Sequence, residues 1–217
     1  MRRGLWIAIL LLSGCASRGA STTAAAPSPP SPPGSPAEAD EYTRYELLDP
    51  SSASFHILYE VTAIKPGADV FFNPIRRGSK ASGERVADRM SGEDLKFDVV
   101  SSDEARRSGL ADAEKDTDYI RIHLPRAVPS DGGQVRLLIE KTYRDPKSYF
   151  ERDGAIFFVR SLSIRRNAIV LPAGFELVSC NVPSQVATEK DGRIRVSFVN
   201  AGPADMPVEI SARRLPS

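Results

Sequence analysis

Two pairs of adjacent arginines are the residues of this chain best suited to holding a charged ligand. The pairs are Arg76 with Arg77 and Arg165 with Arg166. A guanidinium group forks onto a carboxylate or phosphate through parallel N–H donors, so two pairs that the fold brings together form an anion site. Proline and glycine flank the first pair and place it on a loop, where binding residues often lie. The alternative is that each pair straddles a strand end, with one arginine paired to a carboxylate and the other in water.

The nucleophilic and basic residues show no spacing typical of a catalytic centre. The sequence has no Gly-x-Ser-x-Gly elbow and no glycine-rich phosphate loop before a helix. Its two histidines, His56 and His123, fall on separate predicted strands and offer a serine little choice of base. We therefore predict no catalytic residue and no cofactor, while a hydrolase stays open as the alternative.

A run of alternating acidic residues supplies the ligand types that calcium prefers. The run consists of Asp112, Glu114, Asp116 and Asp118. A calcium loop of the EF-hand kind needs glycine at its sixth position and glutamate at its twelfth, and here Thr117 and His123 stand there. The run is predicted to be a solvated loop before a strand, and no metal site is predicted.

Two further features allow two interpretations each. Cys180 lies on a predicted strand and is expected to be a small buried hydrophobe, because a reactive thiol needs a basic neighbour that lowers its pKa. The connector from Tyr143 to Phe150 mixes aromatic and charged residues. It suits either the rim of a binding surface or a cap over the open end of the fold, and the cap is favoured.

The residues after Glu41 follow the two-residue period of strands that have one buried face. Apolar side chains recur at every second position in five runs, which begin at Phe55, Ile120, Val135, Ile194 and Val208. The pairs Asp153-Gly154 and Asp191-Gly192 are typical hairpin turns. The best helix candidate is short, from Ser102 to Ala113. The pattern predicts an all-β, antiparallel β-sandwich over residues 41–217, with at most one short helix.

The charge balance of the predicted domain argues against one class of partner, the nucleic acids. Three of the 29 basic and two of the 28 acidic residues precede Glu41, which leaves 26 of each in the rest of the chain. A domain without basic excess lacks the electrostatic footprint of a general nucleic-acid binder. We predict no nucleic-acid partner, and we expect a monomer because no coiled-coil heptad or obvious edge-pairing strand is present.

The first fifteen residues have the order of a secretory signal peptide. Arg2 and Arg3 precede an apolar run from Leu5 to Leu12 that is too short to span a bilayer. The following Leu12-Ser13-Gly14-Cys15 resembles the lipobox of bacterial lipoproteins. The resemblance implies cleavage before Cys15 and lipidation, such as palmitate, on its sulfur. It also implies sorting by the next residue, where Ala16 in place of aspartate favours the outer membrane, facing the periplasm, in a host with two membranes.

A segment rich in proline, serine and alanine follows the cysteine. It has almost nothing apolar to bury and is predicted to stay extended, reaching on the order of 70 Å at about 3.1 Å per residue. The predicted organisation is thus a signal peptide over 1–14, a lipidated tether over 15–40 and the β-sandwich over 41–217.

One stretch of the predicted domain resembles a known family. The strand Tyr119–Pro125, the turn Val128–Gly133 and the strand Val135–Tyr143 look like the amino-terminal β-sandwich of aminopeptidase-N-type zinc peptidases. The family's zinc motif, His-Glu-x-x-His, is absent from this chain, so the resemblance implies a non-catalytic sandwich.

These observations predict a lipid-anchored cell-envelope protein that binds or scaffolds and has no catalysis of its own. Its expected partners are the membrane, through the lipid on Cys15, and an unidentified envelope protein or anionic ligand. The alternative is an envelope hydrolase or an accessory domain of a separate zinc peptidase.

Overall fold

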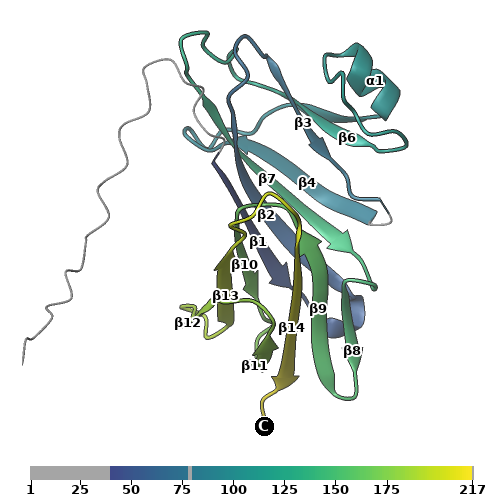
Figure 1. Cartoon of the computed structure of the whole chain (residues 1–217), viewed down its shortest axis with the longest axis vertical. Coiled ribbons are helices and arrows are strands. Elements are labelled where there is room, and N and C mark those ends of the chain that lie inside the picture. Colours follow the sequence, from purple (N-terminus) through teal and green to yellow (C-terminus); the bar gives the residue numbers. More distant parts are fainter. Residues whose placement is uncertain (1–39, 78–79, 217) are drawn as a thin grey trace, which may run out of the picture. The chain divides into compact units, whose positions relative to one another are not determined.

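The computed structural model describes residues 40–77 and 80–216, and the predicted signal peptide, Cys15 and nearly all of the predicted tether lie outside them. The described residues form three β-sheets and one α-helix (Figure 1). The prediction of an all-β fold with at most one short helix is confirmed. None of the helices in this part of the chain is long and apolar enough to cross a membrane.

The largest sheet has seven strands in the order β12-β13-β10-β1-β2-β7-β4. Their bounds are β1 (Glu41–Leu47), β2 (Ser54–Ala63), β4 (Lys80–Asp88), β7 (Val135–Arg144), β10 (Arg166–Val170), β12 (Gln185–Thr188) and β13 (Ile194–Val199). Neighbouring strands are antiparallel except β1 and β10, which run parallel with Tyr45 opposite Ile169. A short 3-10 turn, η1 (Pro50–Ser52), links β1 to β2.

Two smaller sheets complete the domain. The four-stranded sheet has the order β11-β14-β9-β8 and the three-stranded sheet the order β3-β6-β5. Their strands are β3 (Val70–Pro74), β5 (Phe97–Val100), β6 (Tyr119–His123), β8 (Tyr149–Arg152), β9 (Ala155–Leu162), β11 (Phe175–Cys180) and β14 (Met206–Arg214). Figure 1 shows the three-stranded sheet near one end of the long strands and the four-stranded sheet near the other.

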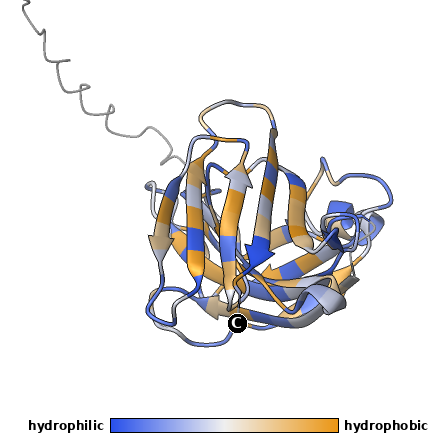
Figure 2. Cartoon of the chain, turned by 90° about the horizontal axis from the view of Figure 1, so that it is seen from below, coloured by the Kyte–Doolittle hydropathy of each residue, from blue (hydrophilic) through white to orange (hydrophobic). Residues whose placement is uncertain are grey.

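The alternation predicted from the sequence decides which side chains enter the core. Along β2 and β7, the side chains from Phe55 to Ala63 and from Val135 to Tyr143 are buried at every second position. Figure 2 shows the same alternation as hydrophobic and hydrophilic bands along the strands. Phe158 of the four-stranded sheet lies 5.5 Å, between ring centroids, from Tyr45 and from Phe55 of the seven-stranded sheet. These aromatic contacts join the two sheets in one core.

The turns follow their residue types, whereas the helix is shorter than predicted. Asp153 and Gly154 both have positive φ and join β8 to β9 as a two-residue turn. The helix α1 (Ser102–Arg107) begins after the N-cap Ser101, whose hydroxyl accepts from the Glu104 amide. It ends six residues before Ala113, because Gly109 adopts φ 105° and the chain leaves the helical path there.

Candidate functional site

The best candidate site is a cavity of about 180 Å³ over the inner face of the seven-stranded sheet, which we name the seam cavity. Both smaller sheets contribute to it: Asn73 comes from β3, and Arg160 comes from β9. It therefore lies where the two covering sheets meet above β1, β2 and β7. The lining residues are Thr43, Tyr45, Ile57, Tyr59, Asn73, Pro74, Arg76, Lys141, Tyr143, Arg160 and Ile164.

Lys141 is the central cation of the cavity. It occupies an inward position of β7, directly across from Ile57 on β2, and is only 5% exposed. Its Nζ donates a hydrogen bond of 2.6 Å to Oδ1 of Asn73 and lies 5.2 Å from the ring centroid of Tyr143. A lysine is rarely this buried unless it is paired, and here its direct partner is a neutral amide.

The surroundings of Lys141 make its charge costly. Burial lowers the pKa of Lys141 most, and the positive charge of Arg160 lowers it further, to about 8. The charge of Glu84 acts in the opposite direction. Glu84 is half-buried in a β-bulge of β4, where Gly83 adopts φ 63° and the pairing with β7 shifts between Ser82 and Arg85. The bulge places two residues of β4 opposite Lys141.

Arg160 is the second buried cation, 7% exposed, and it points inward from β9. Its Nη1 donates to Oδ2 of Asp145 at 3.2 Å. Its guanidinium carbon lies 5.3 to 5.8 Å from the ring centroids of Tyr45, Phe55 and Tyr143. The aromatic rings and one carboxylate thus hold the arginine inside the core.

Asp145 is buried beside this arginine and is well supplied with donors. The Ser148 hydroxyl donates to it at 2.8 Å, and the amides of Lys147 and Ser148 each donate at 3.2 Å. Burial alone would raise the pKa of the Asp145 carboxyl, but the bonds from Ser148 and the charge of Arg160 outweigh it and lower the pKa. Asp145 is therefore ionised and offsets the charge of Arg160.

Arg76 is the exposed member of the three cations and stands at the opening of the cavity. Its backbone amide donates to the Tyr143 hydroxyl at 3.2 Å, and its Nη1 donates to the Ser161 carbonyl at 3.5 Å. The residue follows β3 and so connects the three-stranded sheet to β7 and β9. Burial raises the pKa of Tyr45 and of Tyr143, so these phenols stay neutral and the cations set the charge of the cavity.

Two buried oxygen atoms on β1 and β10 have no hydrogen-bond partner among the described residues. They are Oγ1 of Thr43 and Oδ1 of Asn167. Thr43 lines the cavity, and the two residues are direct neighbours across β1 and β10. Buried polar atoms are normally satisfied by protein or by water. The unpartnered hydroxyl of Thr43 therefore marks a place where a ligand or a water molecule can bind.

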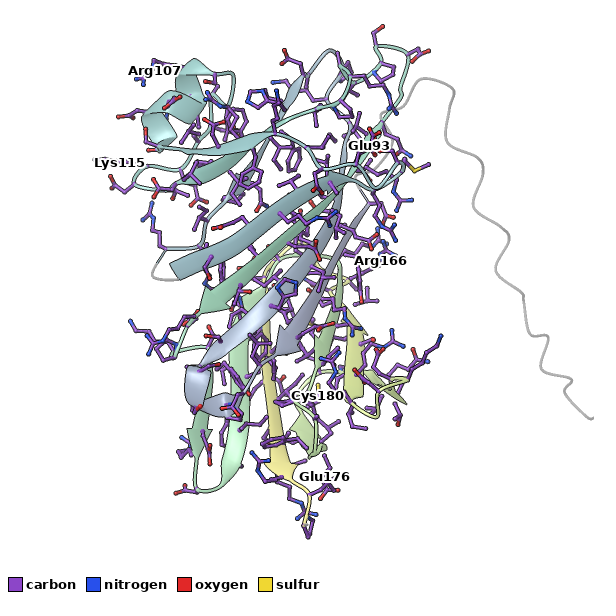
Figure 3. All side chains as sticks on the ribbon, turned by 180° about the vertical axis from the view of Figure 1, so that it is seen from behind. Glu93, Arg107, Lys115, Arg166, Glu176 and Cys180 are labelled. Atoms are coloured by element: carbon purple, nitrogen blue, oxygen red, sulfur yellow. The ribbon has the colours of Figure 1, made fainter. Side chains whose placement is uncertain are left out.

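The two predicted arginine pairs have different partners. Arg76 lines the seam cavity, and Arg77 donates to the Thr117 hydroxyl at 3.3 Å and to the Lys115 carbonyl. Arg166 begins β10 and donates to Asp40 Oδ1 at 2.5 Å. In Figure 3, Lys115 and Arg166 appear on opposite sides of the domain. Arg165 is exposed just before β10, and its carbonyl accepts from the Asn200 amide at 2.8 Å.

The other residues considered from the sequence lie away from the cavity. His56 is near Glu140 (3.8 Å) on the seven-stranded sheet, and His123 is near Asp98 (3.6 Å) on the three-stranded sheet. Residues 40–77 and 80–216 contain no group of three or more His, Cys, Asp or Glu side chains that could hold a metal ion. Cys180 is half-buried against the core, and its thiol donates to the Val182 carbonyl at 3.4 Å.

Sequence reasoning missed Lys141, Arg160 and Asp145. Lys141 continues the inward positions Val135, Leu137 and Ile139, so a cation at a core position was readable from the alternation. Arg160 likewise follows Ile156 and Phe158 along β9. Asp145 lies in the connector between Tyr143 and Phe150, whose two tyrosines are buried. Arg144, Pro146 and Lys147 of the connector are exposed, while its tyrosines and Asp145 are buried.

Comparisons with known proteins give solved structures that are similar to part of this chain. No family model and no curated protein matches the chain. An M1 zinc metallopeptidase from Deinococcus radiodurans is similar, with a TM-score of 0.49 and 11% identity over 81% of this chain and 42% of that one. An aminopeptidase N family protein from Idiomarina loihiensis has a TM-score of 0.45 and 9% identity over 79% of this chain and 29% of that one. This chain thus spans less than half the length of these peptidases.

Proposed function

We propose that this chain is a lipid-anchored binding protein of the cell envelope, and that its β-domain holds a small anionic ligand in the seam cavity. The observation that carries the proposal is the buried Lys141, whose direct hydrogen-bond partner among the described residues is the neutral Asn73 side chain. A buried ammonium group without a carboxylate in direct contact attracts an anion. Arg76 at the opening and the free hydroxyl of Thr43 add donors to the same space.

The cellular setting is part of the proposal and is supported by the sequence. The lipobox-like Leu12-Ser13-Gly14-Cys15 supports a lipid on Cys15, and the proline-rich stretch after it supports a spacer between membrane and domain. Ala16 supports the outer membrane, facing the periplasm, as the site of attachment. The protein would act there as a monomer that binds and does not catalyse.

Anion binding is expected to depend on the charge of Lys141. We expect acetate to bind to the full chain in detergent, and Lys141→Met to weaken this binding about tenfold at pH 7, the value of one charge-assisted hydrogen bond. The affinity of the unaltered chain should fall as the pH rises through about 8, where the Lys141 ammonium loses its proton. Chemical shifts of the amides of Asn73 and Arg76 during the titration measure both effects.

Lys190→Met is the matched control for this experiment, because Lys190 is exposed in the turn between β12 and β13. It removes the same charge from the chain and should leave the affinity for acetate unchanged. Equal weakening by both substitutions would show a general effect of net charge and would contradict the site. The same conclusion follows if acetate shifts none of the cavity amides.

Replacing Cys15 by serine tests the anchor. The Cys15→Ser chain should lose palmitate labelling and partition away from membranes, because serine lacks the sulfur that carries the lipid in the proteins this segment resembles. Metabolic labelling with palmitate followed by membrane fractionation measures both. A Cys15→Ser chain that still labels and still sediments with membranes would show that the lipoprotein proposal is wrong.

An accessory role beside a separate zinc peptidase remains the second candidate. The resemblance of Tyr119–Tyr143 to the amino-terminal sandwich of those enzymes supports it. A domain that only braces another protein has no need of a ligand in the seam cavity. A chain that binds no anion there would therefore favour this role over the first.

A further inference from the structure

The size of the seam cavity limits what it can hold. Its volume of about 180 Å³ is close to the roughly 150 Å³ at which an apolar protein cavity accepts benzene. It is below the roughly 300 Å³ at which typical pockets for drug-sized ligands begin. The ligand is thus a small molecule with a body about the size of one benzene ring.

The walls of the cavity are mostly apolar and aromatic. Ile57, Ile164 and Pro74 line it together with the rings of Tyr45, Tyr59 and Tyr143. With a bare inorganic anion in the cavity, water would still contact these apolar walls, and such contact is unfavourable. An organic anion fills them with its own apolar body, and its charged end meets the cations.

Counting charges decides which anionic group fits. The cavity is lined by Lys141, Arg160 and Arg76. Asp145 offsets Arg160 at 3.2 Å, and the charge of Glu84 acts on Lys141. Glu41 accepts from the Tyr59 hydroxyl at 2.9 Å, but it lines a separate groove beside β3. Three cations thus line the cavity and two carboxylates act on them, a balance that matches a monoanion better than a dianion such as phosphate.

From size, walls and charge we infer that the ligand is a free organic monocarboxylate with a small apolar or aromatic body. This inference rests on the proposed function and names the class of its ligand. Lys141 and Arg76, which line the same cavity, supply the positive charge for the ligand's carboxylate. The apolar body packs against Ile57 and the tyrosine rings.

Benzoate, phosphate and benzyl alcohol are the probes that test the inference on the full chain in detergent. We expect benzoate to bind at least about tenfold more tightly than acetate, because its ring buries apolar surface. Benzoate should also bind at least about tenfold more tightly than phosphate, which carries too much charge, and than benzyl alcohol, which lacks the carboxylate. Titration calorimetry gives the affinities, and the Asn73 and Arg76 amide shifts locate the site.

Glu84→Gln tests the charge count without touching the lining of the cavity. Removing this carboxylate leaves about two uncompensated positive charges, so the affinity for phosphate should rise by a larger factor than the affinity for benzoate. Lys190→Met again serves as the control and should change neither affinity.

Each outcome separates this inference from the proposed function. If acetate binds at the cavity but benzoate binds no more tightly, or phosphate binds as tightly as benzoate, the ligand class is wrong and the anion site stands. If N-acetyl-alanyl-phenylalanine binds more tightly than benzoate, the carboxylate is a peptide end and the free-acid inference is overturned. If no anion shifts the cavity amides, the proposed function fails as well.

Discussion

Replacing Asp145 by alanine is expected to lower the free energy of unfolding by about 3 to 5 kcal/mol. The substitution leaves the Arg160 guanidinium buried among Tyr45, Phe55 and Tyr143 without its carboxylate. It also removes the acceptor of the Ser148 hydroxyl and of the Lys147 amide. An uncompensated buried charge is one of the few changes that cost this much. Urea denaturation followed by tyrosine fluorescence measures the change.

Two further variants show whether the buried charge is the cause. Glu176→Ala breaks an exposed pair with Arg213 at 2.6 Å and should cost less than about 1 kcal/mol. The double variant Asp145→Ala with Arg160→Met should be more stable than Asp145→Ala alone, because no guanidinium is then left unpaired. A cost for Asp145→Ala no larger than that of Glu176→Ala would contradict the assigned pair.

The strands were predictable because burial on one face leaves a two-residue period in the sequence. Phe55 to Ala63 and Val135 to Tyr143 follow that period and form β2 and β7, which pair with each other. The Asp153-Gly154 turn was predictable because both residues tolerate the positive φ of a two-residue hairpin.

The order of the strands was not predictable in the same way. β1 lies between β2 and β10, and its partner Ile169 is more than 120 residues away from Tyr45. Which strands pair over such a distance depends on how the sheets pack, and a local pattern does not carry that information. The end of α1 was missed because a short helix is decided by one residue, and Gly109 ends it early.

At the candidate site, too, features of the local sequence were predictable, whereas contacts between distant residues were not. Arg76 was predicted as a binding residue from its pairing and its loop, and it lies at the opening of the cavity. The alternation of the strands places Lys141 and Arg160 at core positions. Their hydrogen-bond partners, Asn73 and Asp145, come from other parts of the chain and could not be identified from that alternation. A charged residue at an inward strand position is therefore the signal to follow in such sequences.

The second large effect concerns Lys141 and its titration. The pKa of Lys141 is lowered in the folded chain, from 10.5 to about 8, chiefly by burial. Between these two values the unfolded chain binds more protons than the folded chain, so the stability of the folded state rises with pH in this window. Below about pH 8 both states carry the charge, and the full cost of burying it is present.

We therefore expect the stability advantage of Lys141→Met over the unaltered chain to shrink by about 2 kcal/mol between pH 7 and pH 9.5. The substitution also leaves Asn73 Oδ1 without the bond from Nζ, but that cost is the same at every pH and cancels in the difference. Both chains contain the same tyrosines, so the ionisation of tyrosines at pH 9.5 cancels in the difference. Urea denaturation of both chains at each pH gives the result, with Lys190→Met expected to track the unaltered chain. A constant difference between Lys141→Met and the unaltered chain would mean that Lys141 keeps an ordinary pKa. The seam cavity would then lack the costly buried charge on which its attraction for an anion depends.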